Sequence, residues 1–167
     1  CVGHSREELA SILDRLAAAK IDNVLALRGD PPQGEKRFVP TAGGFRFASE
    51  LVGFIREKDY PFCVGAACYP EGHVENASRE VDLANLKRKV DAGADRCITQ
   101  FFFEADAYLR FRDRADLFGI NVPIVPGIMP VSNFQAISRI AGLCGSRVPT
   151  WLARLFDGLD DDLETRR

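Results

Sequence analysis

The stretch Phe62-Cys-Val-Gly-Ala-Ala-Cys-Tyr69 is a continuous apolar run that ends abruptly at Pro70-Glu-Gly-His73. Such a run, bounded by turn residues, predicts a strand that is buried on both faces of its sheet. The residues that follow, from Ala77 to Ala92, predict a helix that stops at Gly93. This strand, turn and helix form the unit on which our prediction of the fold is based.

The same unit recurs along the chain. Further strands are predicted at residues 23–28, 96–103 and 122–130, and further helices at residues 5–20, 48–58, 106–118, 133–143 and 149–156. Ser5, with Glu8 at capping-box distance, is the expected cap of the first helix, and Ser132 that of the helix at 133–143. Residues 33–44 indicate an irregular loop, and the acidic run 160–162 suits the first turn of another helix.

Strands that alternate with helices predict an α/β fold with a parallel sheet. A doubly wound nucleotide-binding fold normally carries a G-x-G-x-x-G motif after its first strand, and neither this motif nor a P-loop occurs. A (β/α)8 TIM barrel needs no such motif, so we favour the barrel. A complete barrel takes about 250 residues. We therefore expect residues 1–167 to be one partial catalytic domain, truncated at both ends, that covers the central and later βα units.

The charge balance argues against two classes of partner. The chain has 22 Lys+Arg against 24 Asp+Glu, a formal net charge of -2. We expect no nucleic acid and no membrane as partner, because the basic footprint and the long apolar run that these partners require are missing from the sequence.

The five cysteines are scattered and include no C-x-x-C pair. This pattern indicates a reducing compartment and no structural zinc or other metal site. Cys63 and Cys68 could form a redox pair, but their spacing in a strand sends the two side chains to opposite faces. We favour buried, inert thiols.

Polar residues gather where the predicted strands end. They are Arg28, Gly29 and Asp30, then Tyr69, Glu71 and His73, then Gln100, and the turn from Gly127 to Pro130. Without two paired carboxylates or a Ser/His/Asp order, this set indicates a ligand cradle rather than a hydrolase. Ser78, Asp82, Asn85 and Lys89 share one stripe of the helix at 77–92, which alone is typical of a solvated face.

Several motifs, in order, closely resemble the methylenetetrahydrofolate reductase family. They are Ala26-Leu-Arg-Gly-Asp-Pro-Pro32, Ala67-Cys-Tyr-Pro-Glu-Gly-His73, Asn85-Leu-Lys-Arg-Lys-Val-Asp-Ala-Gly-Ala94, Ile98-Thr-Gln-Phe-Phe-Phe103, Pro126-Gly-Ile-Met-Pro130 and Phe156-Asp-Gly-Leu-Asp160. The resemblance is greatest to the short bacterial form. It implies a (β/α) barrel that holds FAD and uses NADH or NADPH to reduce 5,10-methylenetetrahydrofolate to 5-methyltetrahydrofolate, in one-carbon and methionine metabolism.

The resemblance also implies roles for individual residues. Asp30 and Gln100 are the expected catalytic and folate-binding residues in this chain, and Gln100 would also contact the nicotinamide. The expected cofactor-binding residues are Arg28, Gly29, Asp30, Tyr69, His73, Asp82, Asn85, Arg88 and Lys89. Carboxylate and amide groups suit ribose hydroxyls, and cations suit a pyrophosphate.

Simpler explanations compete at some positions. Asp30 could merely cap a turn before Pro31, His73 could be a surface imidazole, and Phe101 to Phe103 suit barrel core better than stacking platforms.

The chain departs from the family pattern near Asn133, where the family often has a folate-binding glutamine and this chain has Gln135 followed by Ala136. The family's general-acid glutamate, together with a threonine and a histidine near the flavin, would precede Cys1. Its last strand would follow Arg167. Glu71 is not assigned the acid's role.

We expect a cytoplasmic enzyme that is a homo-oligomer when full length and inactive as the isolated 167-residue chain. The preference between NADH and NADPH stays open. Two alternatives remain: a non-catalytic fragment, and a different flavin- or phosphate-binding barrel.

Overall fold

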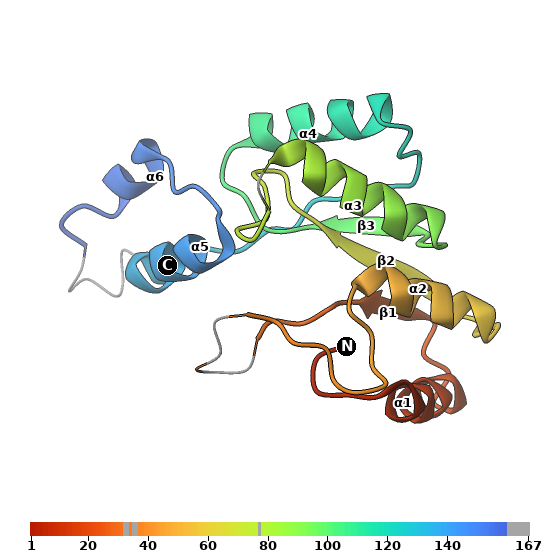
Figure 1. The fold of residues 1–167 in the computed structure, drawn as a ribbon. Helices are drawn as coiled ribbons and strands as arrows, with labels where there is room; N and C mark the ends of the chain where they lie inside the picture. The colour runs from red at the N-terminus through yellow and green to blue at the C-terminus, as the bar shows by residue number, and fades with distance from the viewer. Residues whose placement is uncertain (32–33, 35–36, 77, 160–167) are drawn as a thin grey trace.

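A computed structural model of the 167-residue chain describes residues 1–31, 34, 37–76 and 78–159. Strands and helices alternate along it (Figure 1). The strands are β1 (Asn23–Ala26), β2 (Cys63–Cys68), β3 (Arg96–Thr99) and β4 (Ile124–Val125). The helices are α1 (Arg6–Ala18), α2 (Ala48–Glu57), α3 (Arg79–Asp91), α4 (Ala105–Leu117), α5 (Phe134–Cys144) and α6 (Thr150–Leu155). The acidic run at 160–162 lies outside the described residues.

The four strands form one parallel sheet in the order β1-β2-β3-β4. Asn23 is in register with Cys63, Gly65 with Arg96, and Cys97 with Ile124. The predicted α/β class and parallel sheet are thus confirmed. Within the described residues, β1 and β4 are edge strands and the sheet does not close into a barrel.

Helices α2, α3 and α4 pack on one face of the sheet (Figure 1). Two clusters of buried side chains lie beneath the helices. One joins α1 and α2 to β1 and β2 around Val52 and Val64, and the other joins α3 and α4 to β2 and β3 around Cys97 and Phe111. On the opposite face Leu25, Leu27 and Val125 keep exposed fractions of 44%, 43% and 42%. One face of the sheet is therefore core and the other carries uncovered apolar side chains.

The structure corrects some boundaries and one cap. Strands at 23–28, 96–103 and 122–130 were predicted too long, because only the residues paired with a neighbouring strand adopt the ladder. The predicted cap Ser132 is wrong, since the side chain of Asn133 accepts the N–H of Ala136 and caps α5. The capping box of Ser5 and Glu8 is confirmed, with bonds of 2.7 and 3.3 Å between side chains and backbone N–H groups.

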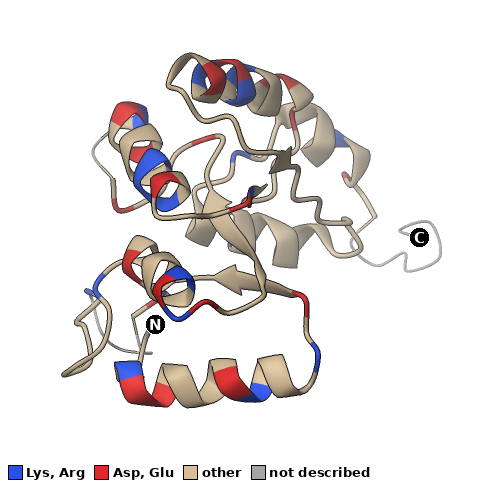
Figure 2. Ribbon diagram, turned by 90° about the vertical axis from the view of Figure 1, so that its right-hand side faces the viewer, with Lys and Arg blue, Asp and Glu red and all other residues tan. Residues whose placement is uncertain are grey.

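Charged residues lie mostly on the helices and loops, where both signs are interspersed (Figure 2). None of the helices in the described part of the chain has the length and hydrophobicity that crossing a membrane requires. The five cysteines are free. Cys63 is half-buried, whereas Cys68 is buried on the helix-covered face, in the same core cluster as Cys97 of the neighbouring strand.

Candidate functional site

A cavity of about 270 Å³ opens at the carboxyl ends of β1 and β2, beside the first turns of α2 and the inner stripe of α3. In a parallel sheet every strand ends at the same edge, and the helix that follows each strand begins there. Polar side chains from segments far apart in sequence therefore meet at this edge.

Seven of the residues predicted from the sequence line this cavity: Arg28, Tyr69, His73, Asp82, Asn85, Arg88 and Lys89. The helix stripe at Asp82, Asn85 and Lys89 thus faces the cavity instead of being a purely solvated surface. Ser78, the fourth member of that stripe, caps α3 by accepting the N–H of Val81. Gly29, Asp30 and Gln100 do not line the cavity.

Lys89 places a cation against the floor of the cavity. Its Nζ donates a hydrogen bond of 2.7 Å to the carbonyl oxygen of Ala67 and lies 5.6 Å from the centre of the Tyr69 ring. Burial lowers the pKa of Lys89. Within the described residues no carboxylate forms an ion pair with it. An anion in the cavity would therefore offset the cost of burying this charge.

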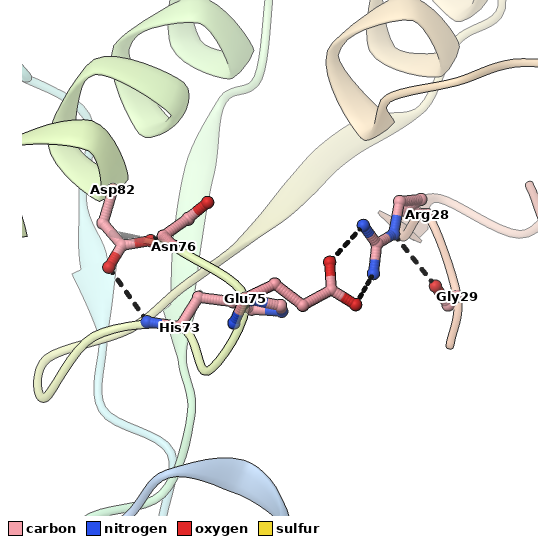
Figure 3. A network of polar contacts seen from close by, with 6 residues as sticks. All are labelled: Arg28, Gly29, His73, Glu75, Asn76 and Asp82. Atoms are coloured by element: carbon pink, nitrogen blue, oxygen red, sulfur yellow. Dashed lines mark hydrogen bonds and ion pairs between the residues drawn. The ribbon is translucent and has the colours of Figure 1, made fainter. Parts of the chain in front are cut away.

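Asp82, only 8% exposed, holds the loop that follows β2. Its Oδ2 accepts the backbone N–H of His73 at 2.9 Å, and its Oδ1 accepts the side-chain amide of Asn76 (Figure 3). Gly72, with φ at 103°, adopts the left-handed conformation that lets this loop turn back. Because a carboxylate offers about four acceptor positions, Asp82 can also accept hydroxyl donors from a ligand.

Tyr69 and His73 meet edge to face, with ring centres 4.6 Å apart. The backbone N–H of Glu75 donates to Nδ1 of His73 at 3.1 Å, so Nδ1 is the unprotonated nitrogen and Nε2 carries the hydrogen. Burial raises the pKa of Tyr69, which keeps its phenol protonated at neutral pH. Both rings line the cavity and offer it polar groups.

Arg28 follows β1 and is the second cation of the cavity. Its guanidinium donates two hydrogen bonds to the carboxylate of Glu75, at 2.7 and 2.9 Å, and its Nε donates to the carbonyl oxygen of Gly29 at 3.2 Å (Figure 3). The same guanidinium lies over the Phe38 ring, 4.8 Å from its centre. The bond to Glu75 raises the pKa of Arg28 and lowers that of Glu75.

Arg88, the third cation, lies exposed at the cavity rim, where it donates to Oδ1 of Asn85 at 2.6 Å. Asn85 thereby keeps its amide N–H groups for other partners. Among the described residues, Arg88 has no carboxylate partner.

Several lining residues were missed from the sequence, among them Phe47, Glu75 and Asn76. Phe47 precedes α2, and Glu75 and Asn76 belong to the loop after β2. The general geometry of βα units could have pointed to them, because the loop after each strand and the start of the following helix lie at the carboxyl edge of the sheet. Their side chains carry no motif of their own, so only the fold places them at the cavity.

The remaining predicted residues lie along the same edge. Gly29 has φ at 87°, and a Cβ there would come within 2.5 Å of the Val2 side chain, so only glycine fits. Asp30 is exposed. Gln100 follows β3; its N–H donates to the carbonyl oxygen of Cys68 at 2.8 Å, and its Oε1 accepts the N–H of Phe101 at 3.1 Å.

Glu71 lies outside the cavity lining and forms a structural contact. Its Oε2 accepts the backbone N–H of Arg147 at 3.0 Å, which ties the loop after β2 to the segment between α5 and α6. In the Gly127 turn, the glycine N–H donates to Oγ1 of Thr99 at 2.8 Å. Gln135 lies in the first turn of α5. Phe101 is buried, whereas Phe102 stacks on Tyr108.

Comparison with known proteins gives a family match over the whole chain. The family model described as "Methylenetetrahydrofolate reductase" matches residues 1–167. The 5,10-methylenetetrahydrofolate reductase of Escherichia coli (strain K12) is 47% identical over 167 residues, covering 100% of this chain and 54% of the relative. Methylenetetrahydrofolate reductase (NADH) 1 of Arabidopsis thaliana is 42% identical over 175 residues, covering 98% of this chain and 29% of the relative. The chain thus spans about half the length of the bacterial relatives.

A solved structure has the same fold at low sequence identity. It is an uncharacterized protein from Clostridium thermocellum that binds two copies of 5-methyl-5,6,7,8-tetrahydrofolic acid. The TM-score is 0.59 at 20% identity, and the match covers 99% of this chain and 54% of that chain.

Proposed function

The chain belongs to the methylenetetrahydrofolate reductase family, and we propose that the full-length protein reduces 5,10-methylenetetrahydrofolate to 5-methyltetrahydrofolate with FAD as cofactor. NADH or NADPH is the proposed hydride donor, and a plant relative is named for NADH. One observation supports this most strongly: seven positions that match the family pattern surround one cavity at the carboxyl edge of the sheet.

The donor set of the cavity fits part of a flavin nucleotide. Arg28, Arg88 and Lys89 can hold a pyrophosphate, and Asp82 and Asn85 can hold ribose hydroxyls. The volume of about 270 Å³ lies near the lower end of the range for ligand pockets, so the cavity accommodates part of a ligand as large as FAD. When bound, FAD would accept a hydride from NAD(P)H and pass it to the folate methylene group.

The chain's own residues position the ligands and tune the charge around them. Asp30, exposed beyond β1, can accept the paired N–H donors of a pterin edge. Gln100 offers amide donors and an acceptor without a charge that must be desolvated, which suits a site shared in turn by a nicotinamide and a pterin. The rate depends largely on this positioning and on the exclusion of water. No residue of this chain is assigned as the acid.

We also propose that residues 1–167 are a single partial domain of a (β/α)8 barrel. The two edge strands and the apolar residues Leu25, Leu27 and Val125 on the uncovered face support this, since closure of a barrel would pair the edges and bury that face. We further propose that the full-length protein is cytoplasmic and forms a homo-oligomer. Its five free cysteines suit a reducing compartment.

The test is turnover by the purified full-length protein. We expect it to carry a yellow flavin and to oxidise NADH or NADPH when methylenetetrahydrofolate is supplied. Turnover with a quinone acceptor but not with the folate would instead favour the alternative, a different flavin-binding barrel. Purifying the 167 residues alone addresses the fragment hypothesis: bound flavin together with NAD(P)H oxidation would contradict our expectation that this part is inactive by itself.

A further inference from the structure

Glu75 lines the cavity and pairs with one of its cations, Arg28. Its side chain bonds only Arg28 among the described residues for which contacts are given, through two hydrogen bonds of 2.7 and 2.9 Å. By contrast, Asp82 is buried and is bonded to His73 and Asn76. Glu75 is therefore free to exchange its partner, and Asp82 is not.

The bond between Arg28 and Glu75 extends across the cavity lining. Arg28 belongs to the end of β1, whereas Glu75 belongs to the loop after β2, 47 residues later. Figure 3 shows Asp82 on α3 bonded to this loop and Glu75 of the same loop bonded to Arg28. The loop keeps two other anchors when this bond breaks, because Asp82 holds it at His73 and the Arg147 N–H holds it at Glu71.

A ligand phosphate and Glu75 require the same donors. Arg28 presents a planar fork of N–H groups that matches a carboxylate or a phosphate equally well. The Glu75 carboxylate occupies both outer nitrogens of that fork and also neutralises one of the three cavity cations. An anionic ligand that enters the cavity must therefore share Arg28 with Glu75 or displace it.

The solvent exposure of the Arg28–Glu75 pair favours displacement of Glu75 by the ligand over sharing of Arg28. The side chains of Arg28 and Glu75 are 23% and 43% exposed. Ion pairs that face water contribute little to stability, so losing this one costs little, and the released carboxylate returns to solvent. The Phe38 ring under the guanidinium keeps Arg28 in place during the exchange.

We propose that Glu75 is a positioning residue that holds Arg28 at the cavity and yields it to the pyrophosphate of the nucleotide ligand, so that Glu75 competes with the ligand for this arginine. This inference rests on the proposed function, because it takes the cavity to be the FAD site. It predicts that removing the charge of Glu75 strengthens binding, the opposite of what removing a direct ligand contact does.

The test compares FAD and ADP binding by FAD-free, full-length variants, measured by calorimetry and by flavin fluorescence. We expect Glu75→Gln to bind both about three- to tenfold more tightly. Glu71→Gln is the matched control, because it lies on the same loop and makes the same charge change but pairs with the Arg147 N–H. In an Arg28→Met background, Glu75→Gln should give no gain, since the arginine for which the two compete is missing.

Weaker binding by Glu75→Gln, unchanged binding, or an equal gain in Glu71→Gln would each overturn the inference and leave the proposed function standing. A wild-type protein that binds neither FAD nor ADP would overturn both.

Discussion

Two arginine–carboxylate pairs lie at opposite ends of the same sheet and are built differently. At the amino ends of the strands, Arg56 donates to the carbonyl oxygens of Gly93 and Phe62 at 2.8 and 2.9 Å and to the carboxylate of Asp95. Asp95 Oδ2 also accepts the N–H of Val64 at 2.6 Å. This network joins α2, the start of β2 and the start of β3.

At the carboxyl ends, the Arg28–Glu75 pair joins the end of β1 to a loop and borders a cavity. The other cavity cations, Arg88 and Lys89, have no carboxylate partner among the described residues. A saturated network stabilises the fold, whereas unsaturated cations are available to a ligand. We therefore interpret the amino end of this sheet as stabilising the fold and propose that the carboxyl end binds the ligand, the division expected of barrel proteins.

The largest expected effect is that of Arg56→Met at the amino end. The substitution removes three hydrogen bonds and leaves partly buried carbonyl oxygens and a carboxylate without their donor, so we expect a loss of about 2–3 kcal/mol in the free energy of unfolding. Urea denaturation of the FAD-free, full-length protein measures it. Arg28→Met is the control and should cost at most about 1 kcal/mol. Equal losses in the two variants would remove the contrast between the two ends.

Lys89→Met, at the carboxyl end, should weaken ligand binding strongly and change stability little. We expect FAD binding to weaken by about tenfold or more, because the ligand loses a charge-assisted contact. The free energy of unfolding without FAD should change by less than about 1 kcal/mol, since the lost bond to Ala67 is offset by relief of a buried charge. Lys87→Met is the control on the same helix, where Lys87 pairs with Asp91, and its FAD affinity should not change.

Asp30→Asn tests whether function at the carboxyl end extends beyond the cavity. A carboxylate near a flavin disfavours the anionic reduced form, so we expect the variant flavin to be easier to reduce. Folate turnover should fall by about tenfold, because the pterin loses a charged acceptor. Potentiometry and steady-state kinetics measure the two effects. The exposed carboxylate of Asp113, changed to Asn, should affect neither; an unchanged potential and turnover in Asp30→Asn would refute the assigned role.

The smallest expected effect is on the pH dependence of stability. Burial opposes ionisation of Asp95, but the Val64 N–H and Arg56 outweigh it and lower its pKa. A lowered carboxyl pKa contributes stability above its ordinary value of about 4, and this is lost as the pH falls through the lower folded value. Asp95→Asn should therefore reduce the loss of unfolding free energy at acid pH by less than about 1 kcal/mol, measured by urea denaturation at a series of pH values. An unchanged acid limb in Asp95→Asn would contradict the role given to this carboxylate.

The periodicity of apolar residues correctly predicted which segments form helices and which form strands. It overestimated the length of three strands. The run from Gln100 to Phe103 is as apolar as a strand, yet β3 ends at Thr99, since pairing stops where the neighbouring strands end. The side chains of Ser132 and Asn133 can both cap a helix, and only the backbone geometry selects Asn133.

The sequence also predicted part of the candidate site but not all of it. The motifs identified the residues around Tyr69 and Lys89 that the fold brings to one cavity. They did not identify Glu75, because its contact with Arg28 joins segments 47 residues apart and depends on how the loop after β2 returns over the sheet. Contacts of this kind follow from tertiary structure and have no local pattern.

The most direct test of the central claim is a crystal structure of the full-length protein with bound FAD. We predict that FAD contacts Lys89 and Arg88 and reaches the carboxyl end of β1 at Arg28. Flavin bound elsewhere, for example against Leu25 and Val125 without contact to these cations, would contradict the assignment of this cavity to the cofactor.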